Sequence, residues 1–579
     1  MLLRFSLTAL VLGVVSSVSA QDRYPITGFS IAEGSAVPLR QNINELQAAG
    51  GAQWDLYIRA LADMQSQNSN DPLSFFQVAG IHGKPYIEWN HTGKRNTNGW
   101  QGYCPHGERL FLTWHRPYVV LYEQVLVATA KRLAETYPQR YRSQYVAAAD
   151  TLRAPFWDWA SSDIPDALVP SKMAVNIPSG SGIRQVQIDN PLATYKFPAA
   201  ALNGTYGSFD SENRSQIYRC PSPDSFPASA NELLADRTYK SWVYDAFTHT
   251  NTFDEFSSTG NGGTSLESIH NAIHWDGACG GQFLAAEFSA FDPIFMLHHC
   301  NVDRLWAYWQ AMRPDQTLFN ESYSGGARWS TPRGTTINTR SPLAPFFADS
   351  DNFHTSESVE SIQAFGYTYE GLEYWQKSEA EMKDDATTLI NRMYSDGETM
   401  SRRLMRRGDD SLTRFFARIK LDVTEVERPC TVNVYLGGKK VGGQVVMQQP
   451  TCGTVHGEFS LDSAIDITEL FGYSLDDVVD TITSGLQVEI LKHDGTNIPI
   501  ESVPSLEIEL EDVEFTPPTR ECELPTYDNA RRRLTTPIQR IVCGCKTSSG
   551  SRDDAYGKNS DHDDESGIEI DVEIGVGKK

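Results

Sequence analysis

The sequence is poor in cysteine and in basic residues. It has nine cysteines in 579 residues and no Cys-x-x-Cys pair, so a disulfide scaffold, a zinc ribbon and a thioredoxin-like redox centre have no support. The 50 Lys and Arg residues face 74 Asp and Glu residues, which gives a net charge of −24. Because polyanions repel a strongly acidic chain, we expect no nucleic acid and no membrane as a partner. Small neutral or cationic substrates remain open.

Long apolar runs are missing beyond the first 20 residues, so we expect no later segment to span a bilayer. Residues 1–20 combine Arg4, an apolar stretch over Leu7–Val15 and the small-residue pattern Val18-Ser19-Ala20, which is typical of a cleaved secretory signal peptide. We therefore expect a secreted, extracellular protein. Secretion makes four Asn-x-Ser/Thr sequons candidate N-glycosylation sites: Asn90, Asn203, Asn213 and Asn320.

The remaining chain has the composition of a folded protein, with 40% hydrophobic and 11% aromatic residues. The part from 21 to 395 predicts a mainly α-helical bundle with long loops, such as 171–208 and 325–345. Helical periodicity is found over residues 43–66, 117–136, 265–274, 293–312 and 375–394.

A charged segment at 396–413 has no apolar period and predicts a linker. It contains the doublets Arg402-Arg403 and Arg406-Arg407, which would suit an activating secretory or extracellular protease. Residues 414–525 alternate with period two and predict a β-rich, sandwich-like domain, in which Gly437–Lys440 forms a hairpin turn. The strands are expected at 416–426, 431–436, 442–447, 486–491 and 506–513. Residues 526–579, with the Cys543-Gly544-Cys545 pair, predict a disordered acidic tail.

Eight of the 13 histidines fall in two windows, 82–115 and 270–299. In the second window, His270 and His274 are four residues apart and share one helix face. His298 and His299 follow within 30 residues. In the first window, His82, His106 and His115 could form a second triad, whereas His91 lies in a polar stretch and is expected at the surface. Two three-imidazole metal sites are therefore predicted.

Imidazole ligands suit copper, zinc, iron or nickel, and no carboxylate stands at an obvious ligand spacing from either triad. This argues against magnesium, calcium and the iron site with two histidines and one carboxylate. Copper and zinc are the best candidates. A dizinc hydrolase is disfavoured because such sites usually include bridging carboxylates.

These residues resemble the tyrosinase and polyphenol oxidase group of type-3 dicopper proteins, and most closely the secreted fungal tyrosinases. The specific signature is Asp292-Pro293-Ile294-Phe295 followed by His299 and Asp303. The likeness also rests on Ile81-His82-Gly83, Tyr103-Cys104-x-His106-Gly107, Trp114-His115-Arg116, Phe156-Trp157-Asp158-Trp159, His270-Asn271-x-x-His274 and Gly366-Tyr367-Thr368-Tyr369.

The resemblance implies two copper ions with O2 as co-substrate. One copper takes His82, His106 and His115, the other takes His270, His274 and His299, and His298 is a non-ligand neighbour. It also implies a thioether between Cys104 and His106. Cys220 and Cys279 are then the best disulfide candidates, and Cys430–Cys452 and one pairing among Cys522, Cys543 and Cys545 are further options, whereas Cys300 is expected to be simply buried.

The resemblance further implies catalysis on small phenols: o-hydroxylation of monophenols and oxidation of o-diphenols to o-quinones, feeding melanin or polyphenol formation. Glu267 and Asn271 occupy the positions of a pair that holds the water for phenol deprotonation. Ala286 implies an open entrance, and Trp275 could line or narrow the pocket. Asp303, one turn beyond His299, is a candidate acceptor for a ligand ring.

Three other readings of the resemblance stay open. A catechol oxidase or an o-aminophenol oxidase would lack the monophenol step, and a haemocyanin-like protein would bind O2 reversibly. Fungal pro-tyrosinases imply latency: the β-rich domain should lie over the copper pocket and insert an aromatic side chain until the linker is cut.

Overall fold

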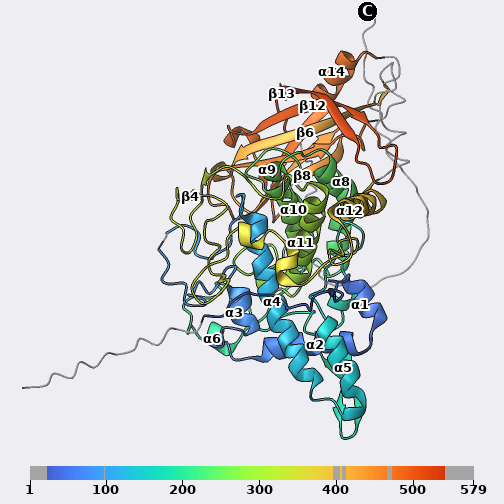
Figure 1. Ribbon diagram of the computed structural model, residues 1–579. Coiled ribbons are helices and arrows are strands. Elements are labelled where there is room, and N and C mark those ends of the chain that lie inside the picture. Colours follow the sequence, from blue (N-terminus) through green and yellow to red (C-terminus); the bar gives the residue numbers. More distant parts are fainter. Residues whose placement is uncertain (1–22, 97, 396–404, 407–411, 466–472, 541–579) are drawn as a thin grey trace, which may run out of the picture. The chain divides into compact units, whose positions relative to one another are not determined.

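Long helices that share one buried core make up the centre of the chain before residue 395 (Figure 1). The computed structural model describes residues 23–96, 98–395, 405–406, 412–465 and 473–540. The expected signal peptide, most of the linker, and Cys543 and Cys545 lie outside these residues. Helix α4 (Phe111–Ala134) packs against α2 (Gly51–Ser66) and α11 (Ile294–Met312), and α11 packs against α12 (Glu379–Tyr394). The remaining helices are α1 (Ile43–Ala49), α3 (Phe75–Gly80), α5 (Gln139–Thr151), α6 (Ala199–Leu202), α7 (Ala228–Ala235), α8 (Tyr239–Thr248), α9 (Phe253–Ser257), α10 (Leu266–Ala278) and α14 (Leu475–Gly485).

Several helix boundaries differ from the sequence predictions. The single helix predicted over 43–66 is broken at Gly50 and Gly51, whose φ angles of +60° and +71° are left-handed and suit glycine. The helix predicted to start at Pro117 starts at Phe111 and contains that proline. The helices predicted at 265–274 and 293–312 are confirmed as α10 and α11.

Part of a predicted loop is a β-hairpin. Strands β1 (Lys172–Ser179) and β2 (Gly182–Asp189) pair antiparallel within the segment 171–208. Two further short strands, β3 (Tyr323–Ser324) and β4 (Thr336–Ile337), pair within the other long connection. The Gly/Ser-rich composition of these segments hid the strands from a pattern search.

After residue 412 the chain forms two antiparallel sheets, as expected for a β-rich sandwich-like part (Figure 1). One sheet has the order β11-β10-β7-β8, and the other has β13-β12-β6-β5, with β9 also paired to β6. The turn predicted at Gly437–Lys440 joins β7 to β8. The strands are β5 (Met405–Arg406), β6 (Leu412–Asp422), β7 (Cys430–Leu436), β8 (Lys439–Val446), β9 (Thr454–Ser460), β10 (Leu486–Lys492), β11 (Asn497–Ile498), β12 (Glu507–Thr516) and β13 (Thr526–Thr535).

The start of the predicted disordered tail is a strand. Residues Thr526–Thr535 form β13 at the sheet edge, paired with β12. Arg531 and Arg533 contact Asp512, and Arg532 contacts Glu511 on the neighbouring strand. Cross-strand ion pairs rather than an apolar face hold this strand, so the search for alternating apolar residues missed it.

We call the described residues up to 395 the helical part and those from 412 to 540 the strand part. The two parts pack together directly. Helix α10 lies against β8, and α8 lies against β9. Buried ion pairs join the two parts, among them Arg414 with Asp245, whose Nη1 and Oδ1 atoms are 2.6 Å apart. Side chains of β8 and β9 therefore face the helix that carries His270 and His274.

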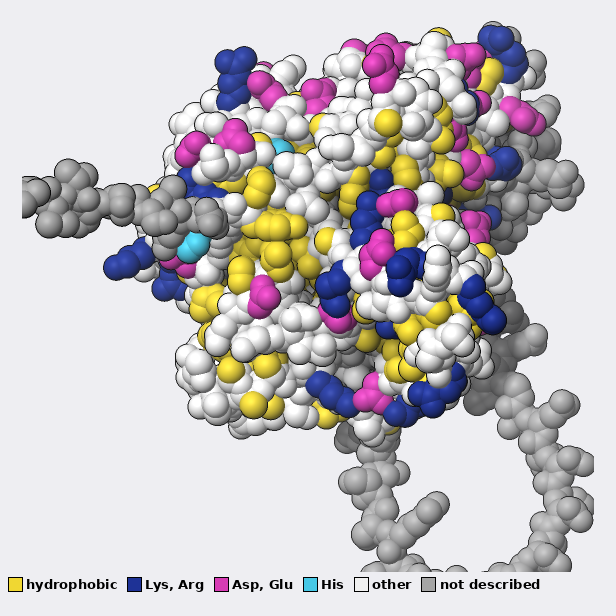
Figure 2. All heavy atoms as spheres, turned by 60° about the horizontal axis from the view of Figure 1, so that its bottom comes forward, with side chains coloured by type: hydrophobic (Ala, Val, Ile, Leu, Met, Phe, Trp, Pro, Cys, Tyr) yellow, Lys and Arg dark blue, Asp and Glu magenta, His cyan; other side chains and the backbone are white. Residues whose placement is uncertain are grey.

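None of the helices in the described part of the chain combines the length and the apolar character that a bilayer crossing requires. On the face drawn in Figure 2, acidic and basic side chains are interspersed among uncharged and apolar ones.

Candidate metal centre and phenol site

Six histidines meet in the interior between α4, α10 and α11. His115 lies on α4, His270 and His274 lie on α10, and His299 lies on α11, while His82 follows α3 and His106 precedes α4. Each of the six side chains is at most 6% exposed. The structure thus brings together all six histidines that the sequence indicated, and His91 is exposed.

The second triad converges through its ring nitrogens. His270 Nε2 lies 3.0 Å from His274 Nε2 and 3.2 Å from His299 Nε2. Neutral imidazoles that aim their lone pairs at one another repel unless a cation or a proton lies between them. The arrangement therefore fits a metal ion bound by three imidazoles.

The first triad faces the second across a short distance. The ring centres of His82, His106 and His115 are 5.3 to 5.9 Å apart. Within the described residues, His82 Nε2 and His115 Nε2 are buried without a hydrogen-bond partner. His115 stacks on His299 with ring centres 4.4 Å apart, so the two triads are adjacent and could hold a pair of metal ions.

Backbone carbonyls fix the other nitrogen of three of the six rings. His82 Nδ1 lies 3.0 Å from the Ala286 carbonyl oxygen, His115 Nδ1 lies 2.7 Å from that of Phe111, and His274 Nδ1 lies 2.7 Å from that of Phe283. Such bonds put the proton on Nδ1 and leave Nε2 as a ligand atom. Ala286, expected only as a small residue at the entrance, thus also holds a ligand ring through its backbone.

The environment keeps these imidazoles neutral. Burial lowers the pKa of His82 to about 4 and that of His274 to about 3, although a backbone hydrogen bond opposes each shift. Burial and neighbouring imidazoles hold the pKa of His270 and His299 well below the usual value. Neutral imidazole is the form that binds a metal.

His106 lacks the anchor that the other rings of its triad have, because its Nδ1 is buried without a partner. The Cys104 Sγ atom is completely buried and donates to the His82 carbonyl oxygen at 3.2 Å. The ligand atoms of His82, Cys104 and His106 all lie within 4.8 Å of one another. A thioether would hold this ring in place of a hydrogen bond; Cys104 is a free thiol in this structure.

Glu267 lies one turn before His270 and is fully buried. Its Oε1 accepts from the Gly107 N–H at 2.8 Å, and its Oε2 accepts from the Thr259 N–H at 2.8 Å and the Thr259 hydroxyl at 3.1 Å. Burial raises the pKa of Glu267 to about 7 against the lowering effect of these donors. A carboxyl group with this pKa can exchange a proton near neutrality.

Asn271 Oδ1 lies 2.9 Å from His270 Nδ1. Its carboxamide oxygen therefore orients a ligand ring, and only its amide nitrogen is left to hold a water molecule as predicted. Trp275 is half-buried on the same helix, with its ring centre 5.6 Å from that of His493 in the strand part.

The sequence predicted that Asp303 accepts from a ligand ring, but the structure gives it other partners. Its two oxygens accept from Arg116 Nε, Arg40 Nη1 and the hydroxyls of Tyr367 and Tyr369, at 2.6 to 2.9 Å. Four charged or phenolic donors use this carboxylate fully. Asp303 therefore binds α11 to α4 and the chain around residue 368, behind the site.

His298 is a completely buried neighbour of the second triad. Its ring centre lies 4.8 Å from that of His270, and neither of its nitrogens has a partner among the described residues. Proximity alone does not separate His298 from His299, because both fall in the group of histidines that could hold one ion. The position of His299, four residues before Asp303, was the distinguishing sequence signal.

The strand part covers the first triad with two non-aromatic residues. The Pro450 ring lies against Gly107, where an added β-carbon would be 2.7 Å from Pro450 Cγ. Burial lowers the pKa of His106, and the neighbouring Gln449 side chain opposes that shift. Among the described residues, the aromatic rings in close contact with the six imidazoles all precede residue 412, and the inserted aromatic side chain stays a prediction.

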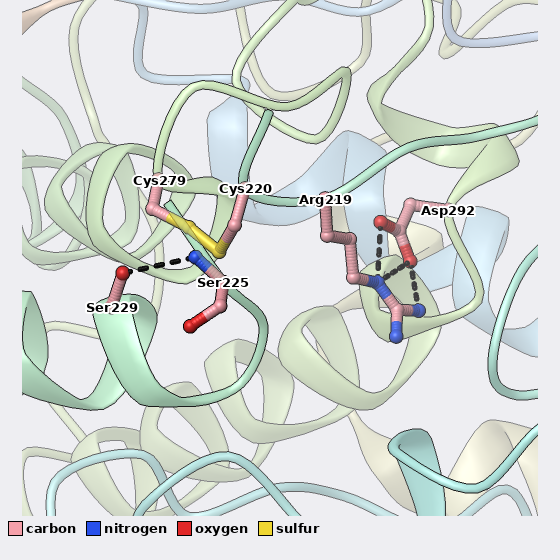
Figure 3. Close-up of a disulfide and its surroundings, with 6 residues drawn as sticks. All are labelled: Arg219, Cys220, Ser225, Ser229, Cys279 and Asp292. Atoms are coloured by element: carbon pink, nitrogen blue, oxygen red, sulfur yellow. Dashed lines mark hydrogen bonds and ion pairs between the residues drawn. A yellow bond between two sulfur atoms is a disulfide. The ribbon is translucent and has the colours of Figure 1, made fainter. Parts of the chain in front are cut away.

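The disulfide predicted between Cys220 and Cys279 is confirmed (Figure 3). Cys279 ends α10, and next to the bridge Arg219 pairs with Asp292, whose Oδ1 is 2.5 Å from Arg219 Nη2. This joins the helix of His270 to the start of the helix of His299. The bridge considered between Cys430 and Cys452 is absent, because both are free thiols, as is Cys522. Cys300 is buried, as expected.

Three of the four sequon asparagines, Asn203, Asn213 and Asn320, are exposed. Asn90 differs, because its Oδ1 accepts from the Tyr24 N–H at 2.7 Å and its Nδ2 donates to the Tyr24 carbonyl at 2.8 Å. A glycan on Asn90 would leave its Nδ2 a single N–H for the second bond.

Some important residues gave no sequence signal. Thr259 and Gln449 reach the site only through contacts between segments far apart in the chain, and no local pattern marks such a residue. The turn at Gly107, with a φ of +66°, was visible only as part of the Cys-x-His-Gly motif.

Comparisons with known proteins agree with this geometry. A family model described as the common central domain of tyrosinase matches residues 72–312. A tyrosinase of Podospora anserina is 35% identical over 391 residues, covering 62% of this chain and 67% of the relative. A recombinant mushroom tyrosinase structure aligns with a TM-score of 0.75 at 24% identity, covering 90% of this chain and all of that one. A mutant of Aspergillus oryzae pro-tyrosinase aligns with a TM-score of 0.71 at 21% identity, covering 90% and 99%.

The structural matches show that the chain has the fold of a dicopper phenol oxidase. The chain belongs to the tyrosinase family. It is thus an oxidoreductase of the tyrosinase and polyphenol oxidase type, and the family implies a dinuclear copper site and phenolic substrates.

Proposed function

We propose that the chain uses O2 to hydroxylate monophenols at the ortho position and to oxidise o-diphenols to o-quinones, which feed melanin or polyphenol formation. The observation that carries this proposal is the placement of Glu267 one helical turn from His270, with its carboxyl group buried and its pKa near 7. A monophenol has a greater need of such a positioned base than an o-diphenol.

The six histidines would hold two copper ions: His82, His106 and His115 one, and His270, His274 and His299 the other. The fit rests on the buried, unpartnered Nε2 atoms of His82 and His115 and on the converging Nε2 atoms of the second triad. When bound, the copper pair would supply the electrons that reduce O2 and the Lewis acidity that binds a phenol oxygen. The Cys104–His106 thioether remains part of this proposal.

The chain's own residues would manage the proton. A phenol has a pKa of about 10, so a monophenol needs a base before its oxygen can bind a metal. Glu267 Oε1 has a free lone pair beside its bond to Gly107 N–H and would take the phenol proton through a water molecule that Asn271 Nδ2 also binds. Small Ala286 would leave the entrance open, and Trp275 would line it.

We propose that the strand part keeps the enzyme latent. Gln449 and Pro450 lie over His106 and Gly107, where they would exclude a phenol. A secretory or extracellular protease would cut between Ser395 and Ser411 and release this cover. Secretion through the signal peptide and glycosylation at Asn203, Asn213 and Asn320 complete the proposal.

The test is an assay of the trimmed enzyme on tyrosine and on DOPA under matched conditions. The proposal expects turnover of both substrates. Turnover of DOPA alone would identify a catechol oxidase, and reversible O2 uptake without turnover would identify an O2-binding protein.

A further inference from the structure

Two loops from distant parts of the chain meet at the Glu267 carboxylate. Gly107 donates its N–H to Oε1, and Thr259 donates both its N–H and its hydroxyl to Oε2. The loops also touch each other, because a β-carbon at Gly260 would lie 2.3 Å from the Gly107 carbonyl oxygen. The carboxylate is thus held between two backbone segments that pack tightly.

The number of acceptor sites on the Glu267 carboxylate determines where a water molecule can bind to it. A carboxylate has about four lone-pair sites, and Gly107 and Thr259 use three of them. The remaining one, on Oε1, has a direction fixed by the three donors. A water molecule bound there would have a defined position, as proton abstraction from a phenol requires.

Thr259 is also held from outside by the strand part. The His456 N–H of β9 donates to the Thr259 carbonyl oxygen at 2.8 Å. The Ser268 hydroxyl donates to the His456 carbonyl oxygen at 3.4 Å. One residue of β9 therefore bridges the Thr259 loop and the first turn of α10, which carries Glu267.

We propose that Thr259 is a positioning residue for Glu267 and that β9, through His456, holds Thr259 in place while the strand part is docked. This inference rests on the proposed role of Glu267 as the base of the monophenol step. It gives the strand part a second effect besides obstruction: docking stabilises the base in one orientation, and after release only the Thr259 N–H and hydroxyl constrain Oε2.

The first test compares Thr259→Val with Thr259→Ser in the trimmed enzyme. Valine removes the hydroxyl donor at nearly constant volume, whereas serine keeps it. Thr259→Val should lower the ratio of monophenol to diphenol turnover about tenfold, the effect of one lost hydrogen bond to a charged group. Thr259→Ser should change it less than about twofold. Ser268→Ala is the matched control, because it removes a buried hydroxyl that contacts Ser265 in the same helical turn but no donor to Glu267, and it should leave the ratio unchanged.

The second test needs no copper and no substrate. In metal-free protein, hydrogen exchange at the Gly107 amide reports whether its acceptor, Glu267 Oε1, stays in position. Thr259→Val should speed this exchange about tenfold, and Thr259→Ser should not. In the unsubstituted chain, removal of the strand part should speed exchange at the Thr259 amide, while exchange at Leu305 in the middle of α11 stays constant.

Equal losses on both substrates in Thr259→Val, or the same behaviour in the valine and serine variants, would overturn the positioning role. Unchanged exchange at Thr259 after release would overturn the role of His456. Glu267→Gln separates this inference from the proposed function. If that variant keeps the turnover ratio, the base assignment itself is wrong; if it lowers the ratio while Thr259→Val does not, only the positioning role fails.

Discussion

At the scale of single residues, the burial and hydrogen bonds of Glu267 set the pKa of its carboxyl group. Removal from water favours the neutral acid, while three donors from Gly107 and Thr259 favour the anion, and the pKa settles at about 7. An exposed Glu would be ionised throughout the neutral range and would be a weaker base. This environment would make the proposed monophenol step sensitive to pH near neutrality.

This gives the first prediction. A base works only when it is deprotonated, so monophenol turnover of the trimmed enzyme should rise as the pH rises through about 7, and diphenol turnover should depend less on pH. Glu267→Gln should remove that rise and lower monophenol turnover about 100-fold, with a small effect on diphenols. Turnover of tyrosine and DOPA, measured from about pH 5 to 9, checks this; equal loss on both substrates would mean that Glu267 only supports the fold.

Asn271 gives a second prediction at this scale. Asn271→Asp keeps an oxygen for His270 Nδ1 but replaces the amide nitrogen that would bind the water molecule. We expect monophenol turnover to fall about tenfold with copper content unchanged. Asn271→Ala should also weaken copper retention, because the ring of His270 loses its partner. If both variants behave like the unsubstituted enzyme on tyrosine, the amide has no part in holding the water.

At the scale of elements, the end of α8 and strand β9 meet in a buried charged cluster. His249 Nδ1 lies 2.8 Å from Glu458 Oε1, and the imidazole stacks on Phe416 with ring centres 4.1 Å apart. His249, Glu458 and Glu511 could hold a metal ion by spacing alone. The Arg418 guanidinium already contacts both carboxylates and supplies the positive charge that a metal ion would bring. The cluster therefore joins the helical and strand parts by ion pairing.

A third prediction follows from the pH dependence of this cluster. Burial lowers the pKa of His249, but the facing carboxylates of Glu458, Glu511 and Asp245 outweigh it and raise the pKa above 6.5, while His249 and Arg418 help to lower that of Glu458 to about 2. A raised histidine pKa stabilises docking at low pH and loses this effect as the pH rises through the raised value. A lowered glutamate pKa stabilises docking above about 4.5 and loses this effect as the pH falls toward 2.

Docking of the strand part should therefore be strongest at mildly acidic pH and should weaken on both sides. His249→Gln keeps a hydrogen bond without the charge. It should raise the activity of the uncut chain about tenfold at mildly acidic pH and abolish the alkaline activation. Turnover of DOPA by the uncut chain against pH, for both forms, measures this, because diphenol turnover depends less on Glu267; identical profiles would show that the pair does not control docking.

The elements also show where sequence reasoning succeeded. Helices α10 and α11 were predictable because their apolar period and histidine spacing are local. The three histidines of the second triad were predicted together with these helices. Strands β9 and β13 were not, because Glu458 is buried by pairing with His249, and Arg531–Arg533 pair with acidic side chains of β12. In both cases long-range charge pairing replaces the apolar pattern. The cover by Gln449 and Pro450 was unpredictable because it depends on contacts between segments far apart in the chain.

At the scale of the whole molecule, charged pairs and apolar contacts such as Trp242 with Phe459 together join the strand part to the helical part. Arg414 with Asp245, and His249 with Glu458, are charged pairs that become solvated on separation. Release of the strand part, as proposed, would therefore solvate these charged pairs and also expose apolar side chains such as Trp242 and Phe459.

Cutting the linker between residues 395 and 411 should therefore raise activity on one catechol at least about tenfold, with copper content unchanged, because access to the site rather than its assembly is limiting. A side-by-side assay of intact and trimmed protein checks this fourth prediction. Equal activities would mean that the strand part only stabilises the fold.

The most direct test of the account is the metal content of the purified chain and of two adjacent variants, His299→Ala and His298→Ala. The account predicts two copper ions per chain, loss of one of them together with all phenol oxidation in His299→Ala, and both copper ions retained in His298→Ala. Full copper and full activity in His299→Ala, or zinc in place of copper in the active chain, would contradict it.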